Sequence, residues 1–149
     1  MKCPPGRGGL CDRGHRSVPH TADLRIEAWG PTREDCLAEA VRGLVESFAE
    51  LGEAGKQRAS VFHLAAGSDA DLLAAAVEEV IYRLDADGQI PAAVEVSRAV
   101  SGGIDLRLRM VDASGVEIVG AVPKAASLSG LTCAAGLSGE WSCAVTVDV

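Results

Sequence analysis

The stretch that decides the fold covers residues 19–48, PHTADLRIEAWGPTREDCLAEAVRGLVESF. Apolar and polar residues alternate over residues 22–29, a pattern that predicts a half-buried strand. The expected buried face carries Leu24, Ile26 and Ala28. Gly30-Pro31 ends this strand, because proline removes a backbone donor and glycine weakens a strand.

A helix is expected directly after this turn. Thr32 is suited to the N-cap, and Glu34 and Asp35 follow in the first turn, where acidic groups are stabilised by the helix dipole. Apolar residues then recur at helical spacing and form one stripe that should face the core. The stripe consists of Leu37, Ala40, Val41, Leu44, Val45 and Phe48.

The rest of the chain predicts one more helix and a run of strands. Gly67-Ser68-Asp69 provides a turn and a cap, residues 72–84 repeat the helical spacing, and an acidic turn is expected at residues 85–88. The expected strands cover residues 60–66, 92–99, 104–110, 116–122, 131–135 and 141–149. Because the later strands lack crossover helices, we predict an α+β fold with two helices packed on a largely antiparallel β-sheet.

The chain length of 149 residues suits a single domain. Residues 1–18 are rich in glycine and proline and show no apolar period, so we expect a flexible N-terminal arm followed by a domain over residues 19–149. Hydrophobic residues make up 48% of the chain but aromatic ones only 3%, so the core must depend on close packing of small aliphatic side chains.

The charge balance argues against strong direct binding of nucleic acid. The formal net charge is −7, and no segment gathers Lys and Arg into a patch that would neutralise phosphates. An acidic protein can still hold a cation or dock on a basic partner. No long apolar run indicates a membrane span or a secretory signal, so a cytoplasmic location is expected.

The five cysteines show no C-x-x-C spacing, which argues against a disulfide framework or a zinc ribbon, and we expect reduced thiols. Cys36 falls in the first helix and Cys143 in the last strand, where small buried hydrophobes are the simpler interpretation. Cys3, Cys11 and His15 have a spacing that fits no standard zinc site.

Candidate ligands for a cation stand at both ends of the domain. Asp23 begins the first strand, and Asp148 lies near the end of the last one, beside the carboxyl group of Val149. Carboxylates held close together repel each other unless a cation neutralises them, and Ca²⁺ or Mg²⁺ prefers oxygen ligands. The site requires the first and last strands to be neighbours; otherwise both are ordinary surface carboxylates. His20 could support it as a hydrogen-bond donor or base, although a lone histidine before a strand is more often structural.

Other catalytic signatures are absent from the sequence. There is no G-x-S-x-G, no Walker loop and no H-E-x-x-H. Asp69, Asp71, Asp85 and Asp87 fall at the two ends of the second helix, where capping and turn formation explain them and calcium-loop spacing is missing.

Four segments together resemble the archease family. They are the H-T-A-D strand with its Thr-capped helix, the second helix with its acidic-Gly turn, the Lys-Ala-containing loop at residues 123–131, and the closing strand at residues 141–149 that ends in Asp-aliphatic. The resemblance implies a non-enzymatic protein cofactor that promotes guanylylation and turnover of the GTP-dependent RNA ligase of tRNA splicing or RNA repair. It also implies a divalent-cation site, with calcium expected, at Asp23, Asp148 and Val149.

The sequence departs from the family pattern at two places. Pro19 stands where an acidic residue often precedes H-T-A-D, and Ser127-Leu128-Ser129 replaces a Thr-Tyr-His run in the loop. Two other functions remain open from the residues: a metal-assisted hydrolase with Asp23 and Asp148 as ligands and His20 as base, and a chaperone-like interaction module.

Overall fold

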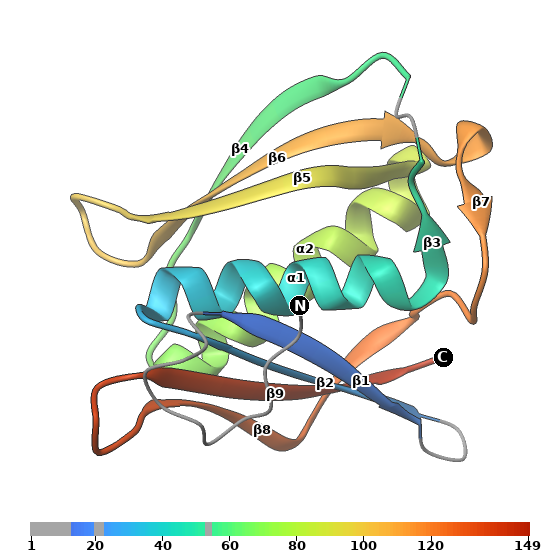
Figure 1. Cartoon of the computed structure of the whole chain (residues 1–149). Coiled ribbons are helices and arrows are strands. Elements are labelled where there is room, and N and C mark those ends of the chain that lie inside the picture. Colours follow the sequence, from blue (N-terminus) through green and yellow to red (C-terminus); the bar gives the residue numbers. More distant parts are fainter. Residues whose placement is uncertain (1–12, 20–22, 53–54) are drawn as a thin grey trace.

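A computed structural model describes residues 13–19, 23–52 and 55–149 of the chain. Helices α1 (Arg33–Phe48) and α2 (Asp69–Asp87) lie between two antiparallel sheets, as Figure 1 shows. Both helices bury their apolar stripes, so the core is a layer of small aliphatic side chains between the sheets. No helix in the described ranges is long and apolar enough to cross a membrane.

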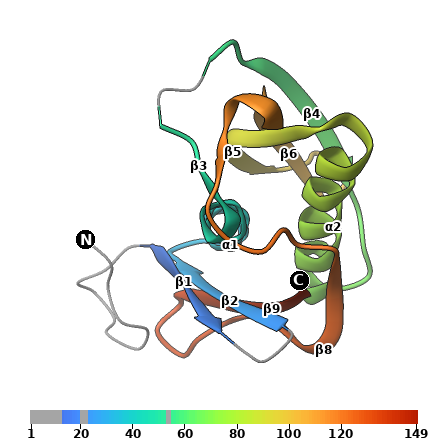
Figure 2. The ribbon, with the colours of Figure 1, turned by 90° about the vertical axis from the view of Figure 1, so that its right-hand side faces the viewer.

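The first sheet has the strand order β1-β2-β9-β8. Its strands are β1 (Gly14–Pro19), β2 (Asp23–Gly30), β8 (Ala125–Ala135) and β9 (Trp141–Asp148). The last strand of the described chain is therefore inserted between two others, with β2 on one side and β8 on the other. Figure 2 shows this sheet below α1, with the C-terminus close to α2.

The second sheet has the order β4-β6-β5, formed by β4 (Arg58–Leu64), β5 (Gln89–Arg98) and β6 (Ile104–Asp112). A separate ribbon pairs β3 (Ala49–Glu50) with β7 (Glu117–Ile118), and a short 3₁₀ turn, η1 (Ala113–Gly115), precedes β7. The four-stranded and three-stranded sheets thus enclose the helices, instead of one sheet lying beneath them.

Helix α1 begins as its cap residues predict. The Thr32 hydroxyl accepts a hydrogen bond of 3.0 Å from the Asp35 amide. Gly43 lies in the middle of this helix, where glycine normally costs about 1 kcal/mol relative to alanine. A Cβ at this position would lie 3.0 Å from the Ile26 side chain and 3.1 Å from His15, so glycine allows the first sheet to approach the helix closely.

Helix α2 is longer than expected from the sequence. It is capped by Ser68 and continues through Asp87, so residues 85–87 belong to the helix and not to a turn. The termination signal is instead Gly88, which adopts the left-handed conformation (φ 62°) that a helix C-cap favours.

The α+β fold with two helices and largely antiparallel strands is confirmed, but several strand boundaries differ. The strand expected at residues 116–122 is reduced to β7, and the strand expected at residues 131–135 begins at Ala125. Polar residues and Gly130 interrupt the apolar alternation of β8, and its pairing with β9 is irregular between Ser127 and Thr132.

Residues 14–18, expected in a flexible arm, form most of strand β1 instead. This strand has no apolar alternation because its buried side chain is polar: His15 is 8% exposed and bonds to carboxylates of α1. Residues 1–12, the remainder of the expected arm, lie outside the described residues.

Candidate metal site

The two carboxylates singled out in the sequence face each other across neighbouring strands. Strands β2 and β9 pair antiparallel, and in their register Asp23 is the direct partner of Asp148. Direct partners in such a pair have Cβ atoms about 4.5–5.5 Å apart and point to the same side of the sheet. The expectation that these two strands are neighbours is therefore confirmed, and we call Asp23 and Asp148 the carboxylate pair.

The carboxylate pair lies on the sheet face that points away from the helices. Alternate residues of β2 and β9 such as Ile26 and Val145 are fully buried against the helices, which places the pair on the opposite face. Asp23 is half-buried and Asp148 is exposed. Among the described residues, neither carboxylate has a basic partner within salt-bridge distance.

Main-chain atoms complete this end of the sheet. The Lys124 amide donates a hydrogen bond of 2.8 Å to the Asp148 carbonyl oxygen, and the next residue, Ala125 of β8, is the register partner of Asp148 on that same side. Val149 follows directly and packs its side chain partly against the core, which fixes the local backbone.

The donor set available to a metal is small. No group of three or more His, Cys, Asp or Glu side chains in the described ranges is arranged to hold an ion. A cation bound here would therefore take the two carboxylates of the pair, main-chain oxygen from Val149, and water, which fits the oxygen preference of Ca²⁺ and Mg²⁺. His20, considered as a supporting group, lies outside the described residues together with Thr21 and Ala22.

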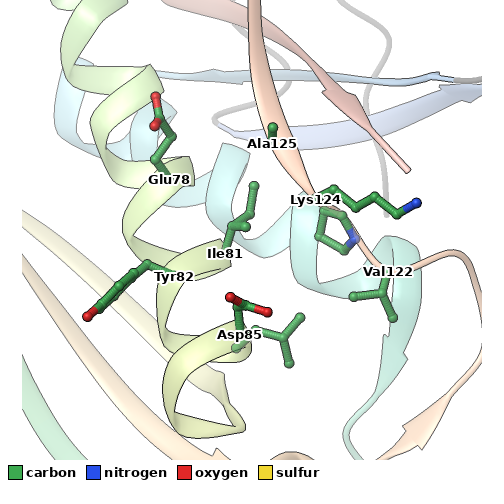
Figure 3. A pocket seen from close by; sticks show the side chains of 9 residues that line it. Glu78, Ile81, Tyr82, Asp85, Val122, Lys124 and Ala125 are labelled. Carbon is green, nitrogen blue, oxygen red and sulfur yellow. The ribbon is translucent and has the colours of Figure 1, made fainter.

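A pocket of about 610 Å³ opens beside this end of the sheet, between α2 and residues 122–125 (Figure 3). Helix α2 contributes the carboxylates of Glu78 and Asp85. Lys124 connects the pocket to the carboxylate pair through its backbone, while its ammonium group points away from α2 in Figure 3. Sequence reasoning missed this pocket because the polar residues come from segments about 40 positions apart.

Unlike the carboxylate pair, the Glu39 carboxylate has several basic neighbours. Glu39 of α1 is 6% exposed, and its carboxylate contacts Arg13 at 2.5 Å, Arg42 at 2.6 Å and His15 at 2.9 Å. His15 also contacts Glu46 at 2.9 Å. We call these five residues the Glu39 cluster. His15 of β1 thus bonds to two carboxylates of α1.

Protonation in the Glu39 cluster follows from these contacts. Burial alone would raise the pKa of Glu39, but hydrogen bonds from His15 and Arg13 and the nearby positive charges lower that pKa to about 2. The hydrogen bond with Glu39 raises the pKa of His15, against an opposing effect of burial. Both shifts favour the charged forms, so this cluster consists of paired ions, and only the Arg13 Nη2 atom among its described nitrogen and oxygen atoms is buried without a hydrogen-bond partner.

The fold and the facing carboxylates define a small α+β protein with a candidate cation site at the end of a central strand. A family model described as the Archease protein family (MTH1598/TM1083) matches residues 15–149. The chain therefore belongs to the archease family, and it is an archease-like accessory protein.

Individual relatives agree with this membership. The chain is 53% identical to "Probable protein archease" of Mycobacterium tuberculosis (strain CDC 1551 / Oshkosh) over 136 residues, which cover 91% of this chain and 75% of the relative. It is 29% identical to "Protein archease" of Methanopyrus kandleri (strain AV19) over 79 residues, covering 53% of this chain and 56% of the relative.

A solved structure supports the same fold. The solution structure of Methanobacterium thermoautotrophicum protein 1598 matches with a TM-score of 0.60 over 91% of this chain and 99% of that one. The sequence identity is 17%, so this likeness bears on the fold alone.

Proposed function

We propose that this accessory protein activates a GTP-dependent RNA-splicing ligase, and that it holds a divalent cation, calcium or magnesium, at Asp23, Asp148 and Val149. The observation that carries the proposal is the direct register pairing of Asp23 with Asp148. Membership of the archease family supports the accessory role.

The electrostatics of the carboxylate pair favour a cation. Like charges placed directly opposite each other in a sheet are destabilising, and among the described residues no Lys or Arg side chain bonds to either group. A bound divalent ion would supply positive charge that neutralises both carboxylates. Strands β2 and β9 hold the carboxylates in place, and the Lys124 amide orients the backbone at Asp148.

The partner would be recognised through charge and position. Transfer of a guanylyl group depends mainly on alignment and on groups that stabilise negative charge on the phosphates. A protein of net charge −7 is suited to a basic enzyme surface and not to the RNA itself, so contact with RNA would be indirect. The rigid end of the first sheet would then contact the ligase near its nucleotide site.

The proposal can be tested by measuring covalent guanylylation of a GTP-dependent RNA ligase with labelled GTP, with and without this protein. We expect the protein to accelerate the reaction by about tenfold or more, equivalent to about 1.4 kcal/mol of barrier. Asp23→Asn and Asp148→Asn should remove most of that acceleration. Asp112→Asn is a matched control, because Asp112 is also an exposed carboxylate at the end of a strand.

Two outcomes would contradict the proposal. One is that this protein does not accelerate the guanylylation of any GTP-dependent RNA ligase from its own organism. The other is turnover of phosphoesters by the isolated protein with Mg²⁺ or Ca²⁺ that disappears in Asp23→Asn, which would favour a metal-assisted hydrolase.

A further inference from the structure

Three cysteines from distant parts of the chain converge in the core. Cys36 belongs to α1, Cys133 to β8 and Cys143 to β9. The Cys36 thiol donates to the Cys143 sulfur at 3.1 Å, and Cys133 is the direct register partner of Cys143. All three are free thiols, and we call them the thiol cluster.

The backbone geometry is compatible with a disulfide across β8 and β9. Direct partners in an antiparallel pair have Cα atoms about 4.5–5.5 Å apart. Disulfides span Cα separations of about 4.4–6.8 Å, so Cys133 and Cys143 need no backbone movement to bond. Their side chains also lie on the same face of the sheet, packed against the same apolar core.

Cys133 is the accessible member of the thiol cluster. It is half-buried on β8, the edge strand of the first sheet, whereas Cys36 is fully buried and Cys143 is 4% exposed. An oxidant from solvent therefore meets Cys133 first.

The neighbouring thiols also favour the reactive form of Cys133. The neighbouring thiols of Cys143 and then Cys36 lower the pKa of Cys133, and the charge of Arg33 acts in the same direction, while burial and Asp69 oppose them. The same contacts raise the pKa of Cys143, so that thiol stays protonated beside a Cys133 thiolate. Thiolates, not thiols, are the nucleophiles in oxidation.

We propose that Cys133 is oxidised by hydrogen peroxide and that Cys143 then closes an intramolecular disulfide with it. The Cys133 thiolate attacks one peroxide oxygen; an S–O bond forms, the O–O bond breaks, and the hydroxide that leaves takes up a proton to become water. The Cys143 sulfur, after losing its proton, attacks the resulting sulfenic acid; the S–S bond forms and a second water leaves. Two thiols are oxidised by two electrons, and one peroxide is reduced to two waters.

The disulfide would fasten the edge strand to the strand that carries Asp148. Pairing between β8 and β9 is irregular from Ser127 to Thr132, directly beside Cys133, so this is the part of the sheet where a covalent bond adds most. The carboxylate pair lies at the other end of β9, five residues from Cys143. Oxidation therefore leaves the cation ligands in place, and this inference stands or falls separately from the proposed ligase role.

The test uses the full chain with Cys3→Ser and Cys11→Ser, so that the remaining thiols are those of the thiol cluster. The protein is treated with hydrogen peroxide, quenched by alkylation, and analysed by intact mass and peptide mapping. We expect a loss of two hydrogen atoms, a fall in alkylated thiols from three to one, a peptide linking Cys133 to Cys143, and full reversal by dithiothreitol.

Single variants assign the roles within the thiol cluster. Cys133→Ala should abolish the Cys133–Cys143 disulfide, because the reacting thiolate is gone. In Cys36→Ala the same disulfide should still form, but more slowly, because one neighbour that lowers the pKa of Cys133 is lost. Circular dichroism should be used to check that each variant folds. If a variant does not fold, the peptide map of the parent protein still decides whether Cys133 and Cys143 are joined. Three unreacted thiols, a sulfinic acid without a disulfide, or a bond joining Cys36 to Cys143 would overturn the proposal.

Discussion

The Glu39 cluster and the carboxylate pair place acidic groups in opposite circumstances. Glu39 is buried, and three basic side chains bond to its two oxygens. Asp23 and Asp148 stand side by side at the surface, and no basic side chain of the described residues pairs with them. In the first arrangement basic side chains pair with the carboxylate, and in the second no basic side chain of the described residues does so.

This difference separates a carboxylate that has basic partners from two carboxylates that have none among the described residues. A buried ion with all its partners contributes to folding only while every partner remains. A pair of unneutralised carboxylates is unfavourable by itself and becomes favourable when a cation binds. The same kind of substitution should therefore have opposite effects in the two regions.

The largest effect is expected at Glu39. Glu39→Ala leaves Arg13, His15 and Arg42 without their shared partner, and removing one member of a buried ion pair costs about 3–5 kcal/mol of unfolding free energy. Urea unfolding measures this cost. A loss below about 1 kcal/mol would mean that water screens the Glu39 cluster as it does surface pairs.

Acidification should lower the unfolding free energy by a comparable amount. Because the pKa of Glu39 is lowered from 4.5 to about 2, its contribution is present above pH 4.5 and is lost as the pH falls toward 2. The difference corresponds to about 3 kcal/mol, at about 1.4 kcal/mol per pKa unit. Unfolding free energies measured from pH 6 to pH 2 should show this loss, and Glu39→Gln should flatten it.

His15 should contribute with the opposite pH dependence. Its pKa is raised above 6.5, so its stabilising charge is fully present below pH 6.5 and is lost as the pH rises through the folded-state value. NMR titration of the His15 ring gives this value directly. In Glu39→Gln it should fall, because the hydrogen bond with Glu39 is the main cause of the shift.

A somewhat smaller effect is expected from Ca²⁺ or Mg²⁺ at the carboxylate pair. At a concentration one hundred times its dissociation constant, a bound ion stabilises the folded state by about 2.7 kcal/mol. The melting temperature should therefore rise on cation titration, and Asp23→Asn should weaken the affinity by about tenfold or more. Equal responses from Asp23→Asn and the Asp112→Asn control would show that no site exists at the pair.

The smallest expected change in unfolding free energy is a gain at Asp148, opposite in sign to the loss at Glu39. In the presence of a chelator, Asp148→Asn should stabilise the protein by about 0.2–1 kcal/mol, because it removes a like charge directly opposite Asp23. Differential urea unfolding at low salt measures it. Destabilisation would show that Asp148 is already satisfied by protein groups.

The sequence predicts the elements whose pattern is local. The alternation in β2, the Thr32 cap and the apolar stripe of α1 all correspond to the structure, since each depends on residues a few positions apart. The alternation in β9 leaves the order of the strands open, and it was the family resemblance that led us to expect Asp23 and Asp148 on neighbouring strands, as their register shows.

Features that depend on distant partners could not be predicted in this way. Strand β1 carries a buried histidine in place of an apolar period, and that burial is possible only because Glu39 and Glu46 lie opposite it. The thiol cluster joins residues about 100 positions apart, and each cysteine alone is typical of a small buried hydrophobe. Division of the strands into two sheets likewise depends on packing around the helices.

The position of β9 inside the first sheet also has a consequence for synthesis. Strand β2 has β1 on one side, but its other edge stays open until residues 141–148 have left the ribosome, and β8 has no other partner in its sheet. Open strand edges invite pairing with other chains. Both helices and all three strands of the second sheet therefore precede β9 in the chain, and the first sheet is complete only when β9 joins β2 to β8.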